Sequence, residues 1–350
     1  MQNPARTEGR VRLSPAKIAF AVAGLALLWL VLKSVNLDEV IFWTIELGWL
    51  GLATVLAVYA AAFLCDVASW QLAFKTLHPG GKWRWLCRLY LVRLAGEAFN
   101  NIIPSASMGG EPVKAVILKS RYRISYRETG ASLIIARTVN MLGLVLFLAA
   151  GFLLLLASPL FTDAYKLTAG TGLVLITAGT VLFYLVQRFQ ITSLAGVWAT
   201  SRKFLPRMDN VLRIINDVDV HLAGFYSGSH AGFGVALALA IGNWLLGVVE
   251  IWVILRLLGI PASFTDCWII EAMAQLVRTG TFFIPASIGA QEGIFLLTGA
   301  AVTGNPSLGV ALSIIRRIRE LIWICLGLAV WAWIPVRLAG GDHKPAGMTS

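Results

Sequence analysis

Charged side chains occur inside strongly apolar segments of this 350-residue chain, and several of them lie in two stretches, 86–118 and 267–303. A charge at membrane depth is costly and usually faces a cavity or a partner. Guanidinium groups near the start of a half-helix can bind a phosphate or another polar head group, and nearby carboxylates can orient them or exchange protons. The ionisable candidates for such a site are Arg93, Glu97, Glu111, Arg137, Arg278, Glu292, Arg316, Arg317, Arg319 and Glu320.

Two spacings predict ion pairs within single helices. Arg93 and Glu97 are four residues apart, as are Arg316 and Glu320, so each pair can meet on one helix face. A second interpretation stays open, in which some arginines form buried ion pairs that only hold the structure together and Arg137 extends to the cytoplasmic interface. Three acids in apolar surroundings, Asp66, Glu250 and Glu271, are cavity or packing residues, and the structural interpretation is preferred.

Each of the two polar stretches contains a similar helix-breaking segment, PSASMGGEP at 104–112 and PASIGAQEG at 285–293. Proline removes a backbone donor and tends to end the preceding helix, while glycine allows a tight turn. We expect Ser105, Ser107 and Ser287 to provide caps for a new half-helix whose first turn contains Glu111 or Glu292. The alternative is that these segments only pack against their neighbours.

The composition, 58% hydrophobic and 13% charged residues, predicts an all-α, polytopic membrane helix bundle. The net charge of +11 comes from basic residues between the apolar runs rather than on one soluble domain, so we expect no nucleic-acid partner. A membrane crossing needs about 20 apolar residues. Six segments qualify as full spans: about 18–35, 48–74, 130–157, 167–187, 231–257 and 309–334.

The basic residues also predict the topology, because short cytoplasmic loops are rich in Lys and Arg. All basic stretches can lie in the cytoplasm only under two conditions. Segment 86–118 must enter and leave the membrane on the cytoplasmic side, and segment 267–303 must enter and leave it on the outer side. Both are therefore predicted to be re-entrant helical hairpins that face opposite ways. The expected organisation is a basic cytoplasmic N-terminus (1–17), one transmembrane domain (18–335) with a cytoplasmic loop (188–230), and a cytoplasmic tail (336–350).

An internal repeat supports this arrangement. An offset of 180 residues places Ala106 on Ala286 and, without a gap, Arg137 on Arg317. Each copy is a broken hairpin followed by a span with an arginine near its start, and an odd number of crossings separates the two. The copies are therefore inverted, as in transporters whose discontinuous helices meet near the membrane midplane.

Known catalytic and nucleotide-binding patterns are absent from the sequence. It contains no HExxH, GxSxG, P-loop or dinucleotide fingerprint, and its four cysteines lack metal-ligand or disulfide spacing. We expect neither a metal nor a cofactor.

The chain resembles the flippase-like family of the lysylphosphatidylglycerol synthase transmembrane domain, and most closely the hopanoid-biosynthesis-associated membrane proteins. The resemblance rests on AGEAFNNIIPSASMGGEPVKA at 95–115, FFIPASIGAQEGIFLL at 282–297 and LSIIRRIRELIW at 312–323. It implies an inner-membrane lipid translocase or lipid-handling protein with paired re-entrant elements. The polar signature of the family falls on Glu97, Asn100, Asn101, Pro104, Gly109, Gly110, Glu111, Arg137, Pro285, Gly289, Gln291, Glu292, Gly293, Arg316, Arg317 and Glu320.

Aminoacylating members of that family carry a large cytoplasmic catalytic domain after the membrane part, whereas this sequence stops at Ser350. We therefore expect a lipid flippase of a bacterial inner membrane rather than an enzyme, with both termini cytoplasmic. Its substrate would be a hopanoid or a phosphate-bearing lipid. Two alternatives are an integral-membrane enzyme that modifies a lipid head group and a non-catalytic scaffold whose partners are lipid-biosynthesis enzymes. No pattern specifies an oligomeric state.

Overall fold

The fold consists of helices packed side by side. The structure is a computed structural model that describes residues 15–74, 81–102, 109–188 and 230–334, and no strand occurs in these ranges. Lipid offers no hydrogen-bond partners, so apolar segments satisfy their backbone groups within helices. The prediction of an all-helical, polytopic membrane protein is confirmed. The elements are α1 (Pro15–Lys33), α2 (Leu37–Glu46), α3 (Gly48–Gln71), α4 (Lys82–Ile102), α5 (Glu111–Tyr122), α6 (Tyr126–Ala157), α7 (Asp163–Arg188), α10 (His230–Leu257), α11 (Phe264–Gly280), η1 (Pro285–Ser287), α12 (Ala290–Thr303) and α13 (Pro306–Trp333).

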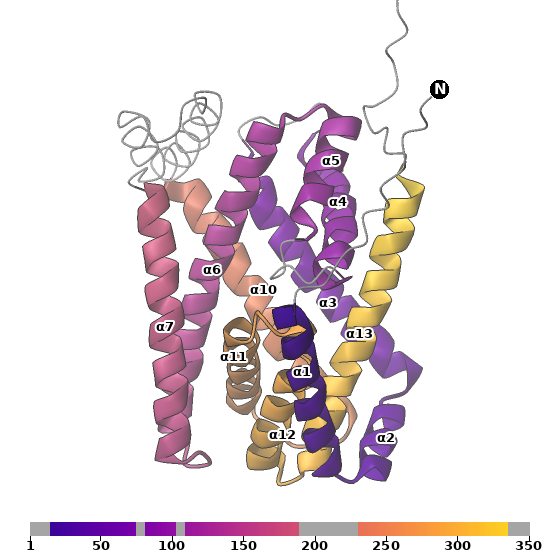
Figure 1. Cartoon of the computed structure of the whole chain (residues 1–350), viewed down its shortest axis with the longest axis vertical. Helices are drawn as coiled ribbons and strands as arrows, with labels where there is room; N and C mark the ends of the chain where they lie inside the picture. Colours follow the sequence, from indigo (N-terminus) through magenta and orange to yellow (C-terminus); the bar gives the residue numbers. More distant parts are fainter. Residues whose placement is uncertain (1–14, 75–80, 103–108, 189–229, 335–350) are drawn as a thin grey trace, which may run out of the picture.

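Four described helices are long and apolar enough to cross a membrane: Gly48–Gln71, Tyr126–Ala157, Asp163–Val186 and Ala231–Leu257. They coincide with four of the six predicted spans. Helix α13 also runs the full height of the bundle, although it carries a cluster of charges (Figure 1). Helix α1 differs from the expected full crossing, because it lies in the lower half of the view and packs against α12.

Two helical hairpins occupy opposite halves of the bundle. Helices α4 and α5 lie in the upper half of Figure 1, and α11 and α12 lie in the lower half. The first hairpin is tightly closed, since a Cβ atom on Gly110 would overlap the carbonyl oxygen of Gly96. Helix α13 packs against both hairpins, through α4 and α12. The hairpins at 86–118 and 267–303 therefore form as helical pairs, with boundaries a few residues from those predicted.

The order of elements repeats with opposite direction. Helix α6 follows the first hairpin and runs downward in Figure 1, whereas α13 follows the second hairpin and runs upward. Helix α6 begins at Tyr126 and α13 at Pro306, which is the same offset of 180 residues that relates Ala106 to Ala286. The backbone arrangement thus agrees with the inverted repeat expected from the sequence.

Equivalent N-caps start these two helices. Ser125 Oγ accepts a hydrogen bond from the Glu128 backbone N–H at 3.1 Å, and Asn305 Oδ1 accepts one from the Ser307 N–H at 2.8 Å. Such caps satisfy backbone donors that have no partner inside the helix. The starts of α6 and α13, and hence the positions of Arg137 and Arg317, are fixed locally by sequence.

The apolar core divides between the same two halves. One cluster surrounds Trp70 and Ile117 and joins α3, α4, α5 and the first part of α6 with parts of α10 and α13. The other surrounds Phe147 and Phe295 and joins the second part of α6 with α10, α11, α12 and α13. Each hairpin therefore packs into a core of its own.

Candidate functional site

Two arginines and two glutamates form a deeply buried charge network. Arg316 donates to Glu271 with two nitrogens, Nη1–Oε2 at 2.5 Å and Nη2–Oε1 at 3.1 Å, and its Nε lies 3.5 Å from Glu250. Arg319 pairs closely with the other oxygen of Glu250. All four side chains are at most 5% exposed. Two positive and two negative charges balance, so this network joins α10, α11 and α13 rather than offering a free charge.

The tip of the second hairpin is held by Arg317. Its Nε donates to Glu292 Oε1 at 2.9 Å, and its Nη2 donates to the carbonyl of Ala286 at 2.8 Å. The Glu292 carboxylate also accepts from the Gly289 backbone N–H at 2.6 Å. Ala286 has a φ of 51°, a region that non-glycine residues rarely adopt. The arginine therefore fixes a strained turn.

The prediction that Ser287 caps the second half-helix is wrong. Gly289 occupies the N-cap position of α12 and is satisfied by the Glu292 side chain. Ser287 instead accepts a hydrogen bond from Thr281 Oγ1 at 3.0 Å. Ser107, its predicted counterpart, lies outside the described residues. Gln291 is buried, and its Oε1 has no hydrogen-bond partner among the described residues.

Glu320 links the tip to the end of α11. It accepts from Arg317 Nη1 at 3.0 Å and from Arg278 Nη1 at 3.0 Å. The side chain of Arg278 is 37% exposed, the largest exposed fraction among the arginines of these ion pairs. Arg278 is consequently the paired cation that an incoming polar group can reach most easily.

The first hairpin contains a second polar set. Asn100 joins both of its arms, because its Oδ1 accepts from the Gly110 N–H at 2.7 Å and its Nδ2 donates to Glu97 at 3.2 Å. Asn101 donates to the Glu97 carbonyl at 3.0 Å, and Gly109 forms the turn before α5. The Asn100 amide thus connects the end of α4 to the start of α5 across the break where the serines were expected to act.

Two further ion pairs support this hairpin. Lys114 is only 1% exposed and donates to Glu111 at 2.9 Å. Arg93 pairs closely with Asp66 on α3, whose other oxygen accepts from Asn140 on α6 at 3.4 Å. The Lys114–Glu111 pair lies within α5, whereas the Arg93–Asp66 pair ties α4 to α3 and, through Asn140, to α6.

The ion-pair partners differ from those that the i, i+4 spacing predicts. Arg93 pairs with Asp66 on a neighbouring helix rather than with Glu97. Arg316 pairs with Glu271 and Glu250 rather than with Glu320. Glu320 instead binds Arg278 and Arg317. For Arg93 and Arg316, an ion pair with a neighbouring helix therefore forms in place of the i, i+4 pair within their own helix.

The two polar sets meet around Tyr59 on α3. Arg319 stacks on the Tyr59 ring at 3.9 Å from its centroid, and the charges of Glu97, Glu320 and Arg278 act on the same phenol. Arg278 also acts electrostatically on Glu97 across the two hairpins. The central site consequently receives charged groups from both halves of the bundle.

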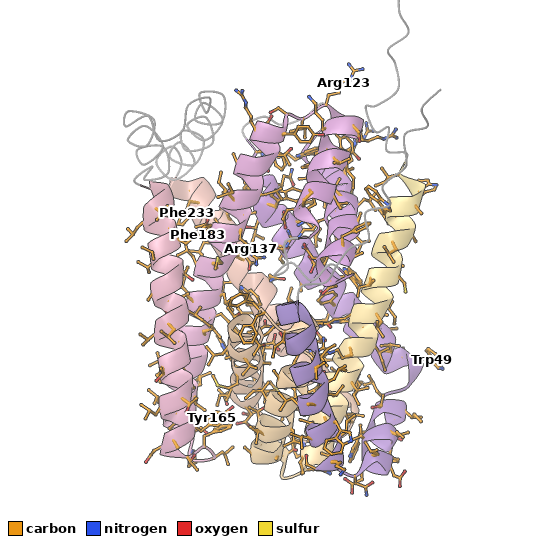
Figure 2. The ribbon with its side chains drawn as sticks, viewed as in Figure 1. Trp49, Arg123, Arg137, Tyr165, Phe183 and Phe233 are labelled. Atoms are coloured by element: carbon orange, nitrogen blue, oxygen red, sulfur yellow. The ribbon has the colours of Figure 1, made fainter. Side chains whose placement is uncertain are left out.

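Arg137 is the candidate that stands apart. It is exposed and makes no ion pair with a described residue. Figure 2 shows it on α6, well below Arg123 at the upper end of the bundle. An arginine at this depth keeps its donors available for an external anion.

Sequence reasoning assigned some of these residues less well than others. Asp66, Glu250 and Glu271 were interpreted as structural, and the structure gives each of them an arginine partner. Lys114 and Tyr59 were not singled out. The available signal for Lys114 was its position four residues after the second glycine of a helix break.

Comparisons with known proteins agree with this architecture. Residues 16–329 match the family of the lysylphosphatidylglycerol synthase TM region. A UPF0104 membrane protein of Methanothermobacter thermautotrophicus is 24% identical over 258 residues, which cover 70% of this chain and 74% of that protein. No solved structure matches the chain. The family match includes both hairpins and every ion pair described above.

Proposed function

Since this chain belongs to the family of the lysylphosphatidylglycerol synthase transmembrane region, we propose that it moves a polar-headed lipid between the leaflets of a bacterial inner membrane. The lipid would be a hopanoid or a phosphate-bearing lipid. The observation that carries the proposal is that one charged group from each opposed hairpin, Glu97 and Arg278, acts electrostatically on Tyr59. A polar head needs such a site to cross the apolar core while its tails remain in lipid.

The proposed orientation places the upper end of Figure 1 in the cytoplasm. Arg123 lies at that end, together with the basic end of α5, whereas α2 and α7 begin at the lower end with acidic residues. Excess Lys and Arg mark the cytoplasmic side. In this orientation both hairpins are re-entrant, the first from the cytoplasm and the second from outside, and both termini are cytoplasmic.

In the proposed mechanism, the head group exchanges between accessible cations. Arg137 would receive it on the side of the first hairpin and Arg278 on the side of the second. Glu320 already binds Arg278, so an anionic head would compete with this carboxylate for the guanidinium. Competition of this kind keeps binding weak enough for release, which transport requires.

Reconstitution into vesicles tests the proposal. Transbilayer movement of fluorescent phosphatidylglycerol and of a fluorescent hopanoid polyol would be measured for the wild type, Arg278→Gln and the control Lys119→Gln, which lies exposed at the end of α5. We expect the wild type and the control to move one of the two lipids and Arg278→Gln to move it at least several-fold more slowly. Chemical conversion of the lipid would favour the enzyme, and no movement of any lipid by the wild type would favour the scaffold.

A further inference from the structure

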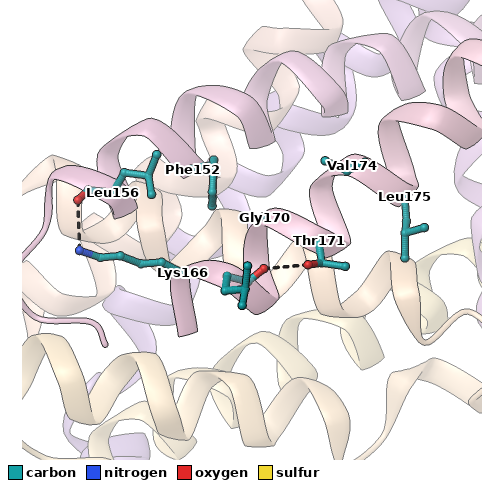
Figure 3. Close-up of a pocket in the computed structure, with 8 residues that line it drawn as sticks. Phe152, Leu156, Lys166, Gly170, Thr171, Val174 and Leu175 are labelled. Carbon is teal, nitrogen blue, oxygen red and sulfur yellow. Dashed lines mark hydrogen bonds between the residues drawn. The ribbon is translucent and has the colours of Figure 1, made fainter. Parts of the chain in front are cut away.

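A groove on the outer surface of the bundle lies between the end of α6 and the start of α7, away from the central site (Figure 3). Its volume is about 560 Å³. The residues that line it are Phe152, Leu156, Lys166, Leu167, Gly170, Thr171, Val174 and Leu175. The Thr171 hydroxyl donates a hydrogen bond to the Leu167 carbonyl at 2.9 Å. Because this donor is already satisfied, the walls are apolar along most of their length.

The groove exists because α7 has a glycine in its first half, opposite α6. A Cβ atom on Gly170 would lie 2.9 Å from the Phe152 ring, so any larger residue would narrow the floor. The walls face the membrane, since Leu167, Val174 and Leu175 are 73%, 65% and 67% exposed. An apolar groove in this position is filled by hydrocarbon rather than by water.

One cation lies at the end of the groove near the α6–α7 connection. Lys166 Nζ donates to the Leu156 carbonyl at 3.1 Å, which uses one of its three donors. The other two have no partner among the described residues. From Lys166 to Leu175 the helix rises roughly 14 Å, close to half of the hydrocarbon thickness of about 30 Å. The groove thus matches one leaflet, with a positive charge at the level of the head groups.

We propose that this groove binds a phospholipid, with one acyl chain between α6 and α7 and its phosphate on Lys166 Nζ. An apolar groove about one leaflet long suits an acyl chain, and the cation at its interfacial end suits a phosphate. Together these two features indicate a phospholipid. The lipid lies in the leaflet at the α6–α7 connection, which is the outer leaflet in the orientation proposed above. Its binding is independent of transport through the central site.

Native mass spectrometry in detergent would test this site, with dioleoylphosphatidylglycerol titrated onto the full-length protein and dioleoylglycerol as a ligand that lacks the phosphate. Lys166→Gln removes the charge, and its control Lys33→Gln removes another lysine at the same end of the bundle. Val174→Trp fills the groove. Its control, Val181→Trp, places the same ring two turns further along the same face of α7.

We expect Lys166→Gln and Val174→Trp to weaken the first binding step about tenfold, the effect of one charge-assisted hydrogen bond or of a blocked chain. Both controls should bind as the wild type does, and dioleoylglycerol should bind the wild type no better than Lys166→Gln binds the phospholipid. Unchanged binding in both groove variants would overturn the proposal. So would a change in the monomer–dimer ratio of Val174→Trp at constant lipid binding, because the groove would then be a contact between two copies of the chain.

Discussion

Arg137 and Arg317 occupy the same position in two oppositely directed helices, each 11 residues after the first residue of α6 or α13. Arg317 is bound by Glu292 and by the Ala286 carbonyl, whereas Arg137 is exposed and makes no ion pair with a described residue. The two halves of the bundle thus carry an arginine at the same position, but this arginine is bound within the second half and exposed in the first. In the proposed transport cycle, this difference corresponds to a closed second hairpin and an accessible site beside the first.

The contrast predicts different consequences for the two arginines. Arg137→Ala should slow lipid movement in vesicles and leave thermal stability within about 0.5 kcal/mol, since surface substitutions rarely cost more. Arg317→Ala should reduce both the rate of lipid movement and the thermal stability, because it leaves the Glu292 carboxylate without its cation. Lipid movement and thermal unfolding in detergent would be measured on the same samples. Equal loss of stability in both variants would contradict the assignment of Arg137 as an unpaired group.

The buried network predicts strong coupling between Arg316 and Glu271. Glu271→Gln or Arg316→Gln alone should destabilise the protein by about 3–5 kcal/mol, because each leaves a buried charge uncompensated. The double variant should lose much less than the sum of the two. A double-mutant cycle on the free energy of unfolding measures this coupling. Additive losses would mean that the two side chains do not form an ion pair in the membrane.

Glycine packing predicts a position-specific effect. Gly110→Ala should destabilise the first hairpin by about 1–3 kcal/mol, since the new methyl group overlaps the Gly96 carbonyl and must push the two helices apart. Gly179→Ala is the matched control, because no atom lies within 4 Å of its Cβ position. Thermal unfolding of the two variants would be compared. A similar midpoint for both would show that the hairpin arms are further apart than in the structure.

The proposed orientation predicts which cysteine variants react in intact cells. Asp163→Cys, at the start of α7, should react with a membrane-impermeant thiol reagent from outside. Arg123→Cys, at the opposite end, should react only after the cells are made permeable. Both would be made with the exposed Cys87 and Cys325 replaced by serine. The reverse pattern would invert the assignment of both hairpins.

The sequence predicts the helical elements well, because their determinants are local. The length of the apolar runs, the prolines and glycines of the two breaks, and the capping residues Ser125 and Asn305 all act within a few positions. The offset that relates Arg137 to Arg317 could also be found, since it requires no knowledge of packing. The position of α1 in one half of the bundle was not predicted, because the length of an apolar run does not show where its helix lies along the bundle.

The ion-pair partners could not be predicted in the same way. Arg319 and Glu250 are 69 positions apart, and Arg316 and Glu271 are 45 apart. Their pairing depends on which faces of α10, α11 and α13 meet, and this follows from packing rather than from spacing. The role of Glu292 at the Gly289 N–H was missed for a different reason. A carboxylate three residues into a helix can satisfy the first backbone donor itself, and it does so here in place of serine.

Helix α13 contacts the first hairpin through α4 and the second through α12, and it also carries the arginines that bind Glu271, Glu292 and Glu250. A rigid rod fastened at two levels cannot shift at one of them alone. In the proposed transport cycle, a tilt of α13 that loosens its contacts with the second hairpin would also change its contacts with the first, so one helix couples the two hairpins without a separate relay.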